Sequence, residues 1–202
     1  MSNDHKIVLD FWFGGDQSFN YKTKWFPTGS KEVQHAADLQ VTTLFQPLLF
    51  MAMSGELADW ANDPKSHLAL IIVLDQFSRH IFRFQELPSD AECRQTADSL
   101  ALSHAECITA TSDWDATFST AEYVFAMMPF RHTATVPRLT SLLDSIAVRE
   151  SAGIEAAELL SKFRKQTTRR LQHLQDRSKV CHMASDTILT LVKQLYVGFI
   201  TG

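Results

Sequence analysis

A polar stretch in the middle of the chain carries the residues best suited to chemistry. Asp75, Arg79 and Arg83 are spaced by four positions, so a helix would align them along one side. Gln76 and His80 would form a neighbouring stripe. Guanidinium groups bind carboxylates and phosphates through paired hydrogen bonds, and imidazoles or carboxylates carry protons. We therefore expect a site that binds an anionic ligand through the two arginines and Gln76. Asp75 and His80 would handle protons there.

The same stretch also has a purely structural interpretation. Buried charges are costly unless they are paired and hydrogen-bonded. Asp75 would then neutralise Arg79, and Arg83 would cap neighbouring carbonyls or tie down a loop. The spacing alone leaves both interpretations open.

A second set of polar residues lies outside this stretch. Asp10 interrupts an otherwise apolar run and is either a satisfied core carboxylate or a pocket acid. His132 lies near the end of an expected helix, where it is either a proton carrier in the same pocket or a capping or surface residue. Glu122 and Arg131 complete the set, with Arg131 as a further ligand-binding candidate.

Aromatic and basic residues offer two weaker candidates. Trp12 and Trp25 either stack against a ligand or fill the core of the first helix pairs. A basic stretch from Lys162 to Lys179 is either a solvated face or a contact for an acidic protein, a phosphate ligand or a nucleic acid. Phe163 is its one aromatic residue, so stacking of nucleic-acid bases is poorly supported.

The composition argues against several classes of protein. The net charge of −4 gives no general affinity for nucleic acid or an anionic membrane. The longest apolar run, residues 68–74, is far shorter than the ~20 residues that cross a bilayer. No zinc-binding, P-loop or dinucleotide motif occurs, so we expect neither metal nor cofactor. The start of the chain does not resemble a secretory signal, and the three cysteines are widely spaced. We therefore expect a cytoplasmic protein.

The elements that must position these residues are helices. Glycine (7) and proline (6) are scarce, and apolar residues recur with helical spacing between capping signals. A break is expected at Pro47, and another at Pro129. The expected helices cover residues 4–13, 30–46, 48–54, 56–61, 65–84, 88–108, 113–128, 137–149, 153–177 and 183–200. The prediction is one all-α domain over residues 1–202, built from antiparallel helix pairs.

Four ordered motifs resemble a known family. They are "VLDFWFG" at residues 8–14 with Trp25-Phe26 after it, "GELADW" at 55–60, "LALIIVLDQFSRHIFR" at 68–83 and "MPFRH" at 128–132. Together they resemble the bacterial domain of unknown function 924 family over about residues 7–132. The resemblance implies a right-handed helical array similar to tetratricopeptide repeats. It implies no activity, because none is assigned to the family.

The chain departs from that family pattern at several positions. Ser78 stands where the family usually has proline, and His80 where it usually has asparagine. Residues 131–134 replace a usual "MHSE", so an acidic residue is lost. The usual C-terminal motif is not recognisable in residues 162–179, and we interpret residues 133–202 as a diverged helical part.

These observations favour a helical-array protein without fixing its chemistry. The concave face, or a polar pocket near Asp75, Arg79 and Arg83, would bind a protein partner or a small anionic or polar molecule. The alternative is a cofactor-independent enzyme that uses acid–base chemistry on a small metabolite in that pocket. Docking of the basic stretch to an acidic macromolecule is a third hypothesis. The residues predict no oligomeric state.

Overall fold

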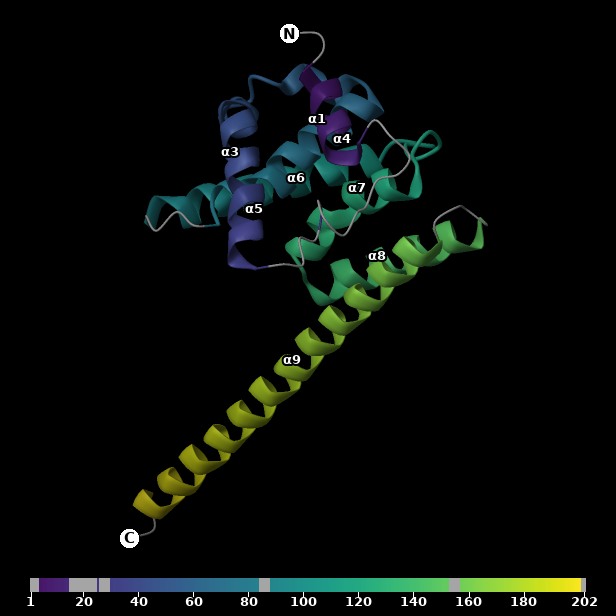
Figure 1. The fold of residues 1–202 in the computed structure, drawn as a ribbon. Coiled ribbons are helices and arrows are strands. Elements are labelled where there is room, and N and C mark those ends of the chain that lie inside the picture. The colour runs from purple at the N-terminus through teal and green to yellow at the C-terminus, as the bar shows by residue number, and fades with distance from the viewer. Residues whose placement is uncertain (1–3, 15–24, 26–29, 84–87, 153–156, 201–202) are drawn as a thin grey trace.

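The computed structural model describes residues 4–14, 25, 30–83, 88–152 and 157–200, with side chains through residue 179 apart from Pro88. These residues form helices and turns and contain no strand, which confirms the all-α prediction (Figure 1). The helical segments are α1 Asp4–Phe13, α3 Lys31–Met53, η1 Ala58–Asn62, α4 Pro64–Ile72, η2 Val73–Phe77, α5 Ser78–Ile81, α6 Pro88–Thr109, α7 Thr120–His132, α8 Val136–Ser151 and α9 Ala157–Ile200. The tetratricopeptide-like arrangement stays a prediction.

A central helical segment, α4–η2–α5, runs through the core. Asp63 caps its start by accepting hydrogen bonds from the backbone N–H groups of Lys65 and Ser66, and Pro64 suits the first helical turn. Every residue from Ser66 to Asp75 is buried, because α1, α3, α6 and α7 pack around this segment. The apolar side chains of Leu70, Ile71, Leu74, Phe77 and Ile81 are all buried in the core.

A π-helical turn, η2, interrupts the central segment at the residue of greatest chemical interest. The wider turn spans Val73 to Phe77 and contains Asp75. The hydroxyl of Ser78 donates to the Leu74 carbonyl at 2.6 Å, with the Asp75 carbonyl 3.2 Å away. These contacts satisfy carbonyls within the irregular turn, where regular i to i−4 bonding is lost. Such turns are often found at functional sites.

Two helices continue through prolines where the sequence predicted breaks. The helix α3 contains Pro47, and α7 contains Pro129. Proline removes one backbone donor, but packing of the residues on either side stabilises the helix. Phe45 and Leu49 flank Pro47 and are both buried in the core. The predicted break was therefore wrong at both positions, because tertiary packing outweighs the local preference.

Other boundaries also differ from the prediction. The helix expected at residues 113–128 begins at Thr120, where Ser119 and Glu122 form a capping box. The short helix expected at residues 56–61 is the 3₁₀ turn η1. The two C-terminal helices expected on either side of residue 180 form one helix, α9.

The last helix extends far from the rest of the molecule. It packs against α7 and α8 near its start and then projects away from the helical body (Figure 1). With 44 residues it is about 66 Å long. Among the described helices, none is both long enough and apolar enough to cross a membrane.

Candidate functional site

Asp75 lies at the centre of a group of polar side chains from four helical elements. Its side chain is 1% exposed. The Arg79 Nη2 atom donates to Asp75 Oδ1 at 3.3 Å, and the Gln76 amide donates to Oδ2. The imidazole Nδ1 of His132, at the end of α7, lies 2.7 Å from Oδ1 and 2.9 Å from Oδ2. Asp98 on α6 binds the same Arg79 guanidinium. We call Asp75, Gln76, Arg79, Asp98 and His132 the Asp75 cluster.

The environment of Asp75 favours its charged form. Burial by itself raises the pKa of this carboxyl group, since it disfavours a charge. The charge and hydrogen bond of His132, followed by those of Arg79, outweigh burial, and the pKa of Asp75 lies below its ordinary value. Asp75 is therefore a carboxylate that orients two partners rather than a proton donor near neutral pH.

A second carboxylate shares Arg79. The Arg79 Nη2 atom lies 2.5 Å from Asp98 Oδ1, so this guanidinium joins the central segment to α6. Burial has the largest effect on the pKa of Asp98 and raises it. The charge of Arg79 lowers this pKa, and the charge of Asp75 has a smaller raising effect. Asp98 is half-buried and so lies at the more open side of the cluster. Sequence reasoning missed it.

Guanidinium groups outnumber carboxylates around the cluster. Arg94 interacts electrostatically with Arg79 and Asp98, and Arg131 interacts with Arg79 and Arg170. Burial first, and then repulsion from the neighbouring arginines, lowers the pKa of both Arg94 and Arg131. We call Arg79, Arg94, Arg131 and Arg170 the arginine group. Arg83 also repels Arg94, but it is paired with Asp38. Apart from that pair, the four cations face two carboxylates, so the described surroundings are net positive.

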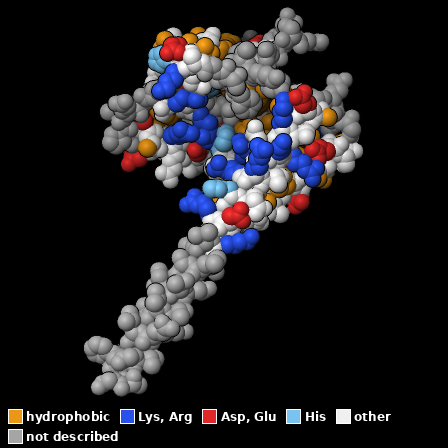
Figure 2. All heavy atoms as spheres, turned by 60° about the horizontal axis from the view of Figure 1, so that its bottom comes forward, with side chains coloured by type: hydrophobic (Ala, Val, Ile, Leu, Met, Phe, Trp, Pro, Cys, Tyr) orange, Lys and Arg blue, Asp and Glu red, His pale blue; other side chains and the backbone are white. Residues whose placement is uncertain are grey.

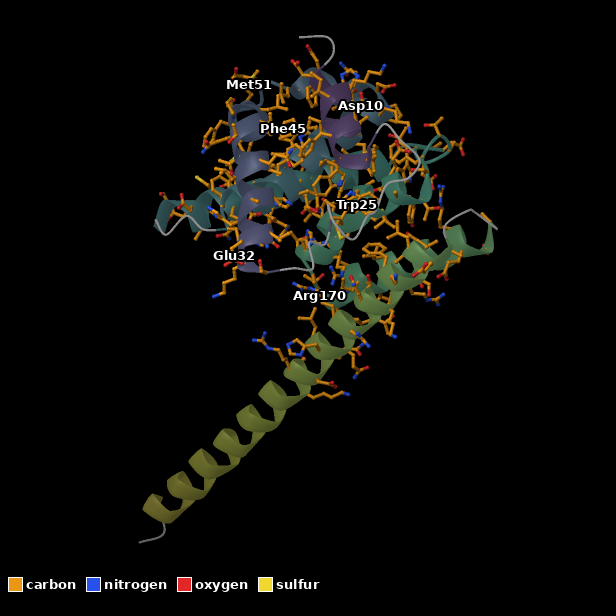
Figure 3. All side chains as sticks on the ribbon, viewed as in Figure 1. Asp10, Trp25, Glu32, Phe45, Met51 and Arg170 are labelled. Carbon is orange, nitrogen blue, oxygen red and sulfur yellow. The ribbon has the colours of Figure 1, made fainter. Side chains whose placement is uncertain are left out.

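The arginine group comes from α5, α6, α7 and α9, and contacts between α5 and α6, α6 and α7, and α7 and α9 link these four helices. Figure 2 shows Lys and Arg side chains gathered across the middle of this face, with histidines beside them. Figure 3 shows Arg170 on α9 where that helix passes below the body. The Nε atoms of Arg79 and Arg131 are buried and have no hydrogen-bond partner among the described residues. Buried donors are usually satisfied, so these two atoms need an explanation.

His80 and Arg83 belong to a different cluster from the one that their spacing suggested. His80 Nδ1 lies 2.7 Å from Asp38 Oδ1, and Arg83 Nε lies 3.3 Å from Asp38 Oδ2. The Gln34 amide donates to Asp38 Oδ1 at 3.1 Å. Burial lowers the pKa of His80, although the hydrogen bond to Asp38 opposes this. The geometry therefore separates His80 and Arg83 from Asp75 and joins them to α3.

Asp10 lies away from the Asp75 cluster. It is exposed on α1, at the end of the body opposite Arg170 (Figure 3). It lines a hollow of about 390 Å³ together with Lys65 and Glu122. Those two residues form a salt bridge of 2.6 Å. The second set predicted from sequence is thus divided, with Asp10 and Glu122 in this hollow and Arg131 and His132 beside Asp75.

The two candidate tryptophans take part in core packing. Trp12 is 1% exposed and makes edge contacts with Phe77 and Phe125, at centroid distances of 5.7 and 5.3 Å. Trp25 is half-buried, packs against Phe125 at 4.7 Å, and donates from Nε1 to the Trp12 carbonyl at 2.9 Å. This packing supports the interpretation of both rings as core residues, since a ligand would have to displace them from aromatic neighbours.

The basic stretch on α9 is mostly a solvated face. Its lysines and arginines are exposed. Lys162 pairs with Glu158, Arg164 with Glu150, and Lys179 lies 3.6 Å from Asp176. Exposed pairs of this kind contribute little to stability. Arg170 differs from the others because it interacts electrostatically with Arg131.

Sequence reasoning missed Asp38, Arg94 and Asp98 as site residues, and it considered Arg170 only as part of the basic stretch from Lys162 to Lys179. Asp38 did leave a signal, because it precedes the buried Val41 and Phe45 by three and seven positions. A carboxylate on the apolar face of a helix requires a partner. Arg94 and Asp98 are four positions apart, a spacing common on ordinary solvated helices. Their role depends on contacts with other helices.

The arrangement of His132 suits proton transfer. Its Nδ1 edge faces Asp75, which fixes the ring orientation and keeps a proton on Nδ1, directed at the carboxylate. Its Nε2 atom makes no hydrogen bond within the described part of the chain, and the side chain is 18% exposed. An imidazole held in this way can accept a proton at Nε2. Among the described residues, no three His, Cys, Asp or Glu side chains are grouped to hold a metal ion.

Comparisons with known proteins agree with the resemblance read from the motifs. A search of curated proteins finds no match. The solved structure of a protein of unknown function from Agrobacterium tumefaciens is similar, with a TM-score of 0.58, 25% identity and coverage of 82% of each chain. The sequence profile described as "Bacterial protein of unknown function (DUF924)" matches residues 8–180, and so extends beyond the four motifs into the part interpreted as diverged. The chain belongs to this family of bacterial proteins of unknown function.

Proposed function

We propose that this chain binds a small anionic molecule beside the Asp75 cluster and that His132 exchanges a proton with it. The observation that carries the proposal is the buried Asp75 carboxylate, which holds His132 and Arg79 together from different helices. One group suits recognition of an anion and the other suits proton transfer. The proposal needs no cofactor.

The charge around the cluster supports an anionic ligand. The arginine group exceeds the nearby carboxylates in number, and repulsion among its members is relieved when an anion binds. Two buried Nε donors, on Arg79 and Arg131, lack partners among the described residues. A phosphate or carboxylate group has the geometry to accept paired hydrogen bonds from guanidinium groups. The expected ligand is therefore a small phosphorylated or carboxylated metabolite.

The hydrogen bond between His132 and Asp75 favours chemistry over simple binding. A site that only bound an anion would need arginines but no imidazole oriented by a buried carboxylate. In acid–base catalysis such a carboxylate fixes the ring and stabilises its protonated form. We therefore place the acid–base enzyme ahead of passive ligand binding. A protein partner at the exposed basic face of α9 remains the second candidate, since Arg169 and Arg177 are exposed there.

A titration with inorganic phosphate tests the binding step. Arg131→Ala removes a cation without stranding Asp75, because Arg131 makes no hydrogen bond to that carboxylate among the described residues. We expect phosphate affinity to fall about ten-fold or more, with the melting temperature nearly unchanged. Arg83→Ala is the matched control, because Arg83 pairs with Asp38 instead. Equal phosphate affinity in the wild type and Arg131→Ala would overturn the proposal.

A second experiment separates proton transfer from binding. His132→Gln can still donate a hydrogen bond to Asp75 but cannot exchange a proton at neutral pH. NMR of small phosphate and carboxylate esters incubated with the protein would detect turnover. We expect the wild type to convert at least one compound and His132→Gln to keep phosphate affinity while losing conversion. Equal conversion by both proteins would refute the role of His132.

Location in the cytoplasm belongs to the same proposal. Cys93 and Cys107 are free thiols, and Cys107 is exposed. Exposed free thiols suit a reducing compartment, where disulfides rarely form. Fractionation of cells that produce the full chain would test this location.

A further inference from the structure

A second pocket lies between α8 and the turn that connects α6 to α7. Its volume is about 430 Å³, within the usual range of small-molecule sites. Its walls include Thr109, Trp114, Tyr123, Ser145 and Arg149. Tyr123 precedes His132 by nine residues on the same helix, so the pocket is about 13 Å along α7 from the Asp75 cluster.

Stacked flat groups build one wall of this pocket. The rings of Trp114 and Tyr123 are nearly parallel, with an interplanar angle of 20° and centroids 5.7 Å apart. The Arg149 guanidinium carbon lies 5.0 Å from the Tyr123 centroid. Tyr123 is buried, whereas Trp114 is only half-buried. Part of the indole therefore remains available to a further flat group.

Arg149 fastens the turn to α8 and so preorganises the wall. One guanidinium nitrogen of Arg149 donates to the Asp115 carboxylate at 2.7 Å, and the other donates to the Phe118 carbonyl at 2.6 Å. Asp113, next to Trp114, has a left-handed backbone with φ of 54°. Aspartate tolerates this conformation better than most residues. These contacts hold the indole in place before any ligand arrives, which lowers the entropic cost of binding.

The charges in the pocket cancel, which favours an uncharged ligand. Arg149 is paired with Asp115, and among the described residues these are the only charged side chains that line this pocket. The Thr109 hydroxyl donates to the Ala105 carbonyl at 2.8 Å, so its oxygen is left to accept a hydrogen bond. The Tyr123 hydroxyl is buried and has no partner among the described residues, an arrangement that a ligand carbonyl would relieve.

We propose that this pocket binds a planar, uncharged aromatic molecule that carries an amide or a similar donor–acceptor group. The flat ring packs against Trp114, and the polar group faces Thr109 and Tyr123. The inference stands apart from the proposed function, because the two sites share no residue. We therefore expect a ligand in the Trp114 pocket to leave the arginine group unmoved, and an anion beside the Asp75 cluster to leave Arg149 unmoved.

Three probes of similar size test the proposal by ligand-observed NMR titration of the full chain. Benzamide is planar and uncharged, cyclohexanecarboxamide has the same amide on a saturated ring, and benzamidine is planar but cationic. We expect saturable binding of benzamide, with each of the other two about ten-fold weaker. Absence of saturable benzamide binding, or equal or tighter binding of either comparison probe, would overturn the proposal.

Two variants locate the binding. Ser145 is exposed on α8 and lines the pocket, so Ser145→Leu fills the pocket without disturbing the core. We expect this variant to fold normally and to lose benzamide binding about ten-fold, as should Trp114→Leu. Arg131→Ala serves as the control and should bind benzamide like the wild type. Unchanged benzamide affinity in a folded Ser145→Leu protein would place the binding elsewhere and refute the proposal.

Discussion

His132 Nδ1 lies 2.7 Å from Asp75 Oδ1, although 57 positions separate the two residues in sequence. The contact joins the end of α7 to the π-helical turn of the central segment. It converts an isolated buried carboxylate into one whose charge is compensated, and it aims the imidazole. Stability and proposed chemistry therefore depend on the same pair.

Replacement of Asp75 should be strongly destabilising. Asp75→Asn removes the charge that compensates His132 and Arg79, and it leaves buried donors facing an amide. We expect a loss of about 3–5 kcal/mol in the free energy of unfolding, measured with urea. Asp98→Asn is the control, because that carboxylate is partly exposed and should contribute about 1 kcal/mol or less. An Asp75→Asn protein as stable as the wild type would contradict this account.

Truncation of Phe77 tests the central core. Its side chain is fully buried, with Phe45 stacked on it at a centroid distance of 4.5 Å. Phe77→Ala should lower the free energy of unfolding by about 3–5 kcal/mol, since it leaves a cavity. Val148→Ala provides a comparison, because Val148 is exposed and should change stability by about 0.5 kcal/mol or less. A loss of under about 1 kcal/mol for Phe77→Ala would argue against this packing.

Acid should destabilise the fold through His67. Burial, followed by repulsion from His104, lowers the pKa of His67 to about 4. In the unfolded chain a histidine titrates at about pH 6.5, so below that pH the unfolded state binds more protons than the folded state. Stability contributed by neutral His67 is therefore complete above about pH 6.5 and is lost as the pH falls towards 4.

His67→Gln gives the measurement that isolates this effect. The variant loses one titrating group, so its unfolding free energy should decline less steeply between pH 6.5 and 4 than that of the wild type. Some decline should remain, because burial also lowers the pKa values of His80 and His104. Parallel pH profiles for the two proteins would show that His67 is not responsible.

The charge surplus predicts a preference for divalent anions. The described surroundings of the Asp75 cluster hold two more arginines than carboxylates. At equal ionic strength, sulfate should raise the melting temperature more than nitrate, because a ligand that binds the folded state stabilises it. Arg94→Gln should reduce the difference between the two salts. If sulfate and nitrate act alike on the wild type, the cations do not form a single site.

Much of the fold follows from local pattern. Apolar residues at helical spacing predicted the helix over residues 65–84, which corresponds to α4–η2–α5. The start of α1 at Asp4 and its end before Gly14 agree with capping rules. The helix breaks that the local pattern predicted at Pro47 and Pro129 do not occur. The preference of proline to end a helix is a local energy, whereas burial of Phe45 and Leu49 is a property of the assembled core.

In the candidate site, too, local contacts could be predicted from the sequence, whereas contacts between helices could not. The residue types and the spacing of Asp75 and Arg79 were sufficient to predict their contact, because an i, i+4 pair on a helix is local. The choice of His132 over Asp10 as the neighbour of Asp75, and of Asp38 as the partner of His80, depends on which helices pack together. Charge pairing acts over a few ångströms of space and is indifferent to distance along the chain, so only the packed helices determine which carboxylate meets which cation.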